Sequence, residues 1–166
     1  LACCFQDGGG EIIMGKPVHS LEDLPPASYY YYDVTPRQLF NIRGLGLSEH
    51  YRQRLIKFRY GPGVYKMDWA LREPIPWKAD ICRKAGTVHL GNSYEEIATS
   101  VRSVNKGDIP FSPYMMLAQQ SLFDPSRSPE GRHTAWGYCH VPHGSDVDMA
   151  DLIENKIERY APGFRE

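Results

Sequence analysis

Hydrophobic and polar residues alternate most regularly in residues 64–71, which we expect to form a β-strand. Because the side chains of a strand point alternately to its two faces, one face would carry Tyr65, Met67, Trp69 and Leu71, and the other Val64, Lys66, Asp68 and Ala70. A lysine and an aspartate on one strand face suit the wall of a ligand cavity, and they also suit a sheet with one face in water. The pattern leaves open which face lines a cavity.

Turn residues and apolar runs predict the other elements of the chain. Further strands are expected at residues 11–14, 17–21, 29–34, 87–90, 114–120 and 133–141. Helices are expected at residues 35–44, 48–59, 93–107 and 146–160, after the end of an earlier helix that stops at the glycines 8–10. Because strands and helices do not alternate strictly, we expect an α+β fold with a mixed, mostly antiparallel sheet and about four helices.

Two helix starts are marked by their residues. Thr35 is a hydroxyl N-cap followed by Pro36 at the first helical position, and Ser93 with Glu96 forms a capping box. Apolar residues at helical spacing predict the buried positions Tyr51, Leu55, Phe58, Ile97, Val101, Val104, Met149, Ile153 and Ile157.

Composition limits the classes of function. The chain has 166 residues, enough for one domain with a core, and its net charge of −1 gives no broad field to attract nucleic acid. No apolar run approaches the roughly 20 residues of a membrane span. The four cysteines are too few and too irregularly spaced for a disulfide framework, so we expect reduced thiols and a cytoplasmic protein.

Trp136, Tyr138 and His140 would share one face of the strand expected at residues 133–141. They suit an aromatic, partly polar cavity wall, and they also suit ordinary packing. Cys139 and His140 would point to opposite faces of that strand, so we expect no metal site there.

Motifs for nucleotide binding and for hydrolysis are absent from the sequence. Gly44 and Gly46 resemble half of a dinucleotide-binding loop, but they follow an expected helix and the third glycine is missing. No G-x-S-x-G elbow frames a serine. We therefore expect neither catalytic nor cofactor-binding residues in this chain.

Several stretches, in one consistent order, span nearly the whole chain and resemble the middle part of FAD-dependent oxidoreductases of the phytoene dehydrogenase-related group, within the amine-oxidase-like flavoproteins. The longer central stretches are the most specific. All the resembling stretches together are GGEI at Gly9–Ile12, DVTPRQLF at Asp33–Phe40, YGPGVYKMDWAL at Tyr60–Leu71, AGTVHLG at Ala85–Gly91, QSLFDPSRSPEGRHTAWGYCHVPHG at Gln120–Gly144 and IERYAPGF at Ile157–Phe164.

The resemblance implies a division of the chain. Residues 1–34 would be a partial edge of the cofactor lobe with its crossover strands, and residues 35–166 the substrate-binding lobe that roofs the flavin. FAD would bind in the parent protein, through segments that this chain lacks. The resemblance further implies an apolar substrate contacted by some of Tyr65, Lys66, Met67, Asp68, Trp69, Trp136, Tyr138 and His140.

Two other functions remain open: a free-standing domain that binds an apolar small molecule, and a protein-interaction domain, both without redox activity. If residues 1–34 are part of a cofactor lobe, their strands lack neighbours. We then expect an exposed aromatic sheet edge and a tendency to dimerise through it.

Overall fold

The computed structural model describes residues 1–166 and divides into two compact units, Leu1–Arg59 (unit 1) and Tyr60–Glu166 (unit 2). Each unit is described by itself. The boundary expected between residues 34 and 35 separates a cofactor lobe from a substrate-binding lobe. It is a division by function, and it stays a prediction.

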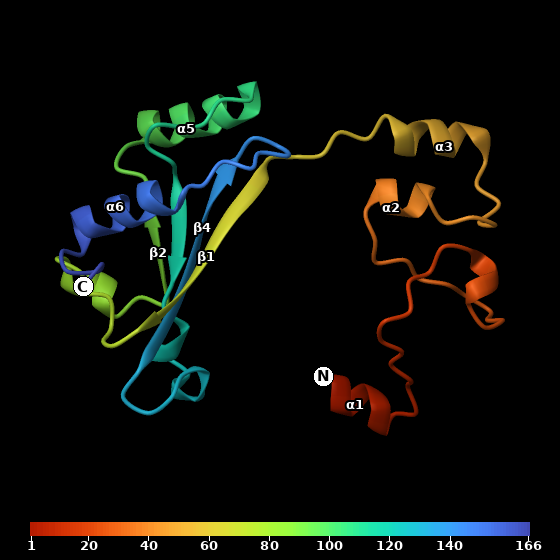
Figure 1. Cartoon of the computed structure of the whole chain (residues 1–166), viewed down its shortest axis with the longest axis horizontal. Helices are drawn as coiled ribbons and strands as arrows, with labels where there is room; N and C mark the ends of the chain where they lie inside the picture. Colours follow the sequence, from red (N-terminus) through yellow and green to blue (C-terminus); the bar gives the residue numbers. More distant parts are fainter. The chain divides into compact units, whose positions relative to one another are not determined.

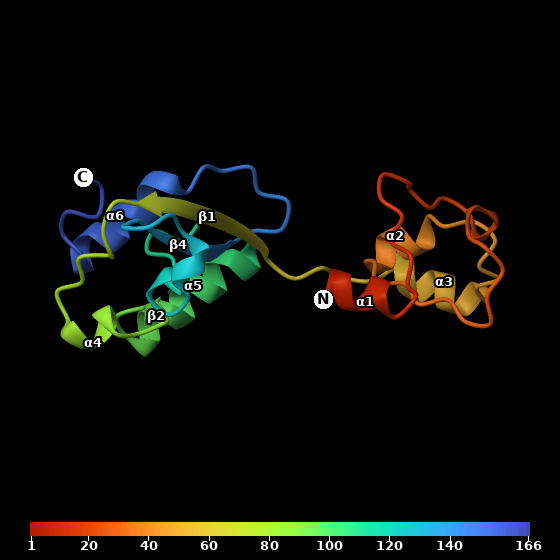
Figure 2. The same cartoon turned by 90° about the horizontal axis from the view of Figure 1, so that it is seen from below.

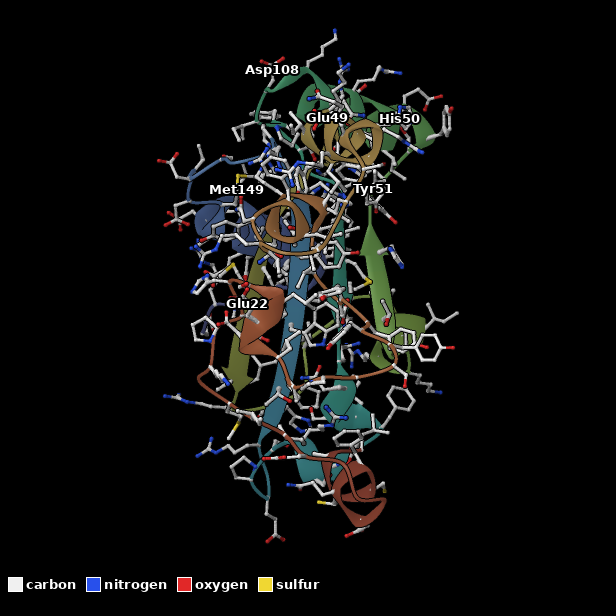
Figure 3. The ribbon with its side chains drawn as sticks, turned by 90° about the vertical axis from the view of Figure 1, so that its right-hand side faces the viewer. Glu22, Glu49, His50, Tyr51, Asp108 and Met149 are labelled. Carbon is white, nitrogen blue, oxygen red and sulfur yellow. The ribbon has the colours of Figure 1, made fainter.

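Unit 2 is built on one four-stranded sheet, whose strands lie side by side in Figure 3. The order is β1-β4-β3-β2, and every neighbouring pair is antiparallel. The strands are β1 (Gly63–Leu71), β2 (Thr87–Leu90), β3 (Met115–Ala118) and β4 (His133–Val141). The expected α+β class is confirmed, and the sheet, expected to be mixed and mostly antiparallel, is antiparallel throughout.

The chain has six α-helices, more than the four or so expected. They are α1 (Ala2–Asp7), α2 (Pro36–Phe40), α3 (Glu49–Ile56), α4 (Asp80–Arg83, labelled in Figure 2), α5 (Tyr94–Lys106) and α6 (Ala150–Tyr160). Short 3-10 turns occur at Leu21–Asp23, Gln120–Leu122 and Pro125–Arg127. None of the helices combines the length and the apolar composition needed to cross a membrane.

One face of the sheet is covered by α6 and by the segments that flank it (Figure 1). The buried positions expected on the last helix, Met149, Ile153 and Ile157, are confirmed, and Met149 lies just before the first turn of α6 (Figure 3). They pack in a core with the inward residues of all four strands and with Ile75, Trp77, Ala161 and Phe164.

The helix caps follow the sequence in part. Thr35 and Gln38 form a reciprocal capping box at α2. Ser93 accepts the amide hydrogen of Glu96 at α5, but the Glu96 side chain turns to other partners. On α5, Val104 is buried as expected, whereas Val101 is 44% exposed.

Unit 1 differs most from the expectation. The strands expected at residues 11–14, 17–21 and 29–34 are wrong: these segments are irregular, and the one bridge joins Ser20 to Arg43. A strand needs a neighbour to satisfy its backbone groups, and apart from this one bridge none is present for these segments. Tyr31 is 94% exposed.

The stripe expected on α3 is buried only at Leu55, whereas Tyr51 and Phe58 are exposed. Unit 1 therefore has a thin core, formed around Leu55 and Ile42.

Candidate functional site

The pairing of β1 with β4 places the candidate residues on two opposite faces of the sheet. Lys66 lies opposite Tyr138, and Asp68 lies opposite Trp136. We call the uncovered side of the sheet the open face; it carries Val64, Lys66, Asp68, Ala70, Thr87, His89, Met116, Ala118, Thr134, Trp136, Tyr138 and His140. The structure thus brings together five of the eight candidate residues, those at positions 66, 68, 136, 138 and 140.

The other three candidates, Tyr65, Met67 and Trp69, lie on the covered face. All three pack against the core. The Tyr65 hydroxyl donates to Asp148 at 2.6 Å, and the Trp69 indole donates to Glu154 at 3.1 Å. The hydrogen bond to Asp148 also raises the pKa of Tyr65.

An aromatic row runs along β4 on the open face. The rings of Trp136 and Tyr138 stack with centroids 6.2 Å apart and planes 11° apart. The His140 ring meets Tyr138 edge-on at 5.7 Å. All three rings are partly exposed. Because every second residue of a strand faces the same way, the row is a direct consequence of the spacing of these residues.

The charges on the open face balance each other. Lys66 is hydrogen-bonded to both carboxylate oxygens of Asp68, and its ammonium lies 5.4 Å from the centroid of the Trp136 ring. The lysine is thus held by a carboxylate and by the face of an indole, a favourable cation–π contact. With the two charges neutralised locally, the surface suits an uncharged, flat ligand.

Strands β2 and β3 extend the open face. The sequence predicted both strands, but it did not show that they contribute residues to this face. Met116 lies opposite Tyr138 on β3, and His89 lies opposite Met116 on β2. His89 Nδ1 is 2.7 Å from the Tyr114 hydroxyl, and the two rings stack with centroids 5.8 Å apart. Alternation within β3 indicates that Met116 and Leu117 face opposite ways, but only the register between strands shows which of them joins the aromatic row.

A groove of about 590 Å³ lies beside the covered face, where the end of β1 meets the C-terminal segment. Trp69 and Phe164 form part of its lining, with their rings edge to face at 5.5 Å. Its walls also carry five charged residues: Arg72, Glu73, Glu154, Arg165 and Glu166. Arg165 is already bound to Asp151, Glu154 and Asn155. The groove is therefore less suited to an apolar ligand than the open face is.

A polar cluster joins α5, α6 and the start of β3. The buried Lys156 donates to Pro113 O at 2.8 Å, to the Ser112 hydroxyl at 3.0 Å and to Glu96 Oε1 at 3.2 Å. Hydrogen bonds from Ser112 and Asn92, together with Lys156, lower the pKa of Glu96 to about 2. Each polar group finds a partner inside the protein, so the cluster has a structural role.

Cys139 lies on the covered face, opposite in direction to His140, as the sequence predicts. Burial raises the pKa of its thiol to about 11. A thiol that stays protonated at neutral pH is a poor nucleophile and a poor metal ligand. No cluster of three or more histidine, cysteine, aspartate or glutamate side chains in the chain has the geometry to hold a metal ion.

The pyrophosphate of FAD does not fit the residues present. A pyrophosphate would need a short turn between a strand and an α-helix, and the shortest one joins β2 to α5 through Gly91. The space beside Gly91 is already filled, because a Cβ placed there would lie 2.6 Å from the Ile97 side chain. The first turn of α5 also carries Glu95 and Glu96, which repel an anion. We therefore derive no step through the flavin from this chain.

Comparison of the chain with protein-family models, with curated proteins and with solved structures gave no match.

Proposed function

We propose that this chain is the substrate-binding part of an FAD-dependent oxidoreductase similar to the phytoene dehydrogenase-related group. The parent enzyme would act on an apolar substrate. The observation that carries the proposal is the open face, a row of partly exposed rings on a rigid sheet with its charges neutralised. Trp136 and Tyr138 are the central contacts.

The shape of the open face supports a role as one wall of a site. Small-molecule sites are usually concave and bury most of the ligand. A sheet face offers only one wall, so a second wall must come from elsewhere, and a cofactor lobe in the parent protein would supply it. The flavin would then perform the redox chemistry, while this chain would orient the substrate and exclude water.

In this proposal Lys66, Asp68, Trp136, Tyr138 and His140 contact the substrate. Tyr65, Met67 and Trp69 support them from the covered face, where they fix the position of β1. We further propose a cytoplasmic location, which is supported by four cysteines that are all unpaired. We also propose that the chain associates with itself through a free strand edge. Residues 1–34 form no strand, so the edge expected there is absent, and the free edge belongs to the sheet of unit 2.

The decisive experiment is a visible absorption spectrum of the natural parent protein, purified from its source. We expect a flavin band that remains with the protein through gel filtration. A colourless parent protein that takes up no added FAD would contradict the oxidoreductase proposal. The open face would then favour the second candidate, a free-standing domain that binds an apolar small molecule.

A further inference from the structure

Strand β1 has one edge without a backbone partner. All nine of its residues pair with β4 on one side, and β1 ends the strand order on the other. No backbone hydrogen bond connects its outer edge to a loop. The strand contains neither proline nor an interrupted register. Such a long, regular edge is a template for another strand.

The residues of β1 are complementary to themselves in an antiparallel pair. If Met67 of one copy lies opposite Met67 of a second copy, Lys66 of each copy lies opposite Asp68 of the other. Both charged residues lie on the open face, so they meet on the same side of the joined sheet. On the covered face the same register places Tyr65 opposite Trp69, an aromatic cross-strand pair.

Neighbouring registers lack this complementarity. With Lys66 on the two-fold axis, two lysines would lie opposite each other, and with Asp68 on the axis, two aspartates would do so. Like charges directly opposite on a sheet are destabilising. A lysine on an edge strand usually opposes pairing, but here the aspartate two residues later supplies its partner in one register.

We propose that two copies of this chain associate through the outer edges of β1, with Met67 on the two-fold axis. The two four-stranded sheets then form one continuous sheet, and the two open faces lie on the same side. The backbone bonds along the edge supply most of the affinity, because exposed ion pairs contribute little. The Lys66–Asp68 pairs select the register. This association rests on the self-association proposed above and names its edge and its register; it does not depend on the flavin or on the substrate.

The test uses the whole 166-residue chain and two charge reversals, Lys66→Asp and Asp68→Lys. Each variant places like charges opposite each other, so we expect its dimer to dissociate at least about tenfold more readily than the wild-type dimer. When the two variants are mixed, every opposed pair again has opposite signs. We therefore expect the mixture to form a heterodimer.

Sedimentation velocity at roughly 100 µM, a concentration suited to weak specific interfaces, measures these states. The control is Lys84→Asp, an exposed position outside the strands that changes the net charge as Lys66→Asp does and should leave the wild-type dimer intact. An unchanged far-UV circular dichroism spectrum shows that each variant is folded; tryptophan emission does not serve here, because Lys66 lies against the Trp136 ring. A monomeric wild type, single variants that still dimerise, or a mixture that stays monomeric would each overturn the proposal.

Discussion

Trp69 and Trp136 lie on the two directly neighbouring strands β1 and β4, but on opposite faces of the sheet, and their surroundings differ. The Trp69 indole is hydrogen-bonded to Glu154 and touches Phe164 edge-on. The Trp136 ring is stacked on Tyr138, lies beneath the Lys66 ammonium and is partly exposed. The covered face uses its large side chains to hold the fold together, whereas the large side chains of the open face stay partly exposed to solvent.

This difference has a physical meaning. Burial of apolar area is the main stabilising term, so rings that stay partly exposed, as Trp136 and Tyr138 do, forgo stability that a covering element would provide. Apolar surface that remains accessible on a sheet face can serve as a binding site. The comparison predicts that substitutions on the covered side will reduce stability, and that substitutions on the open face will reduce binding.

The largest loss of stability is expected for Trp77→Ala, on the covered side. Trp77 is 1% exposed, and its indole donates to Gln119 at 2.9 Å. Truncation leaves a cavity and an unpaired acceptor on a buried side chain, which together cost about 3–5 kcal/mol of unfolding free energy. Urea unfolding followed by tryptophan fluorescence measures the loss. This signal reports unit 2, because Trp69, Trp77 and Trp136 are the three tryptophans of the chain and all lie in it.

Trp77→Phe is the control, since it keeps a six-membered aromatic ring in the core but removes the part of the indole that carries the N–H. We expect it to lose less than half as much stability as Trp77→Ala. Equal losses for the two variants would show that this N–H-bearing part of the indole, and not the packing of the remaining ring, dominates at this position.

The next largest effect is expected for Lys156→Met, which removes the cation from the cluster between α5 and α6. Glu96 and the Pro113 carbonyl then lose their shared donor, and we expect a loss of about 3 kcal/mol. The double variant Lys156→Met with Glu96→Gln removes both charges and should be more stable than Lys156→Met. The same urea titration compares them, and a double variant that is less stable would count against a coupled pair.

Acid should weaken the same cluster. The pKa of Glu96 is lowered from 4.5 to about 2 in the folded state, so its contribution to stability is fully present above about pH 4.5. It is lost as the pH falls from 4.5 towards 2, because the unfolded state then binds a proton that the folded state does not. Unfolding at a series of pH values should show this decline, and Glu96→Gln should make it shallower.

The smallest effect on stability is expected for Tyr138→Ala, on the open face. The ring is partly exposed, and the strand retains its pairing with β1 and β3. We expect a loss below about 1 kcal/mol by urea unfolding. A loss as large as that of Trp77→Ala would mean that the aromatic row belongs to the core of unit 2 after all.

The sequence predicted unit 2 better than unit 1 for a physical reason. Strand β4 and the buried stripe of α6 follow from local periodicity, which the sequence displays directly. The strands expected at residues 11–14 and 29–34 also had suitable residues, but a strand forms only beside another strand. Periodicity carries no information about whether that neighbour exists.

The candidate site shows the same limit. Periodicity grouped Lys66 with Asp68 and Trp136 with Tyr138, but it could not join the two groups. The register between β1 and β4 joins them, across about 70 residues of chain. The role of Lys156 likewise depends on Glu96, 60 residues away along the chain. Long-range pairing of this kind is set by the whole core and cannot be read from a local pattern.

The most direct test of the open face is the binding of all-trans-retinol, an apolar polyene, followed by quenching of tryptophan fluorescence. The wild-type chain should bind it saturably, and Tyr138→Ala should weaken binding by roughly tenfold, equivalent to 1.4 kcal/mol. Tyr65→Phe, a variant of the covered face, should bind as the wild type does. Equal binding by the wild type and Tyr138→Ala, or a loss confined to Tyr65→Phe, would contradict the assignment of the open face as the ligand-binding surface.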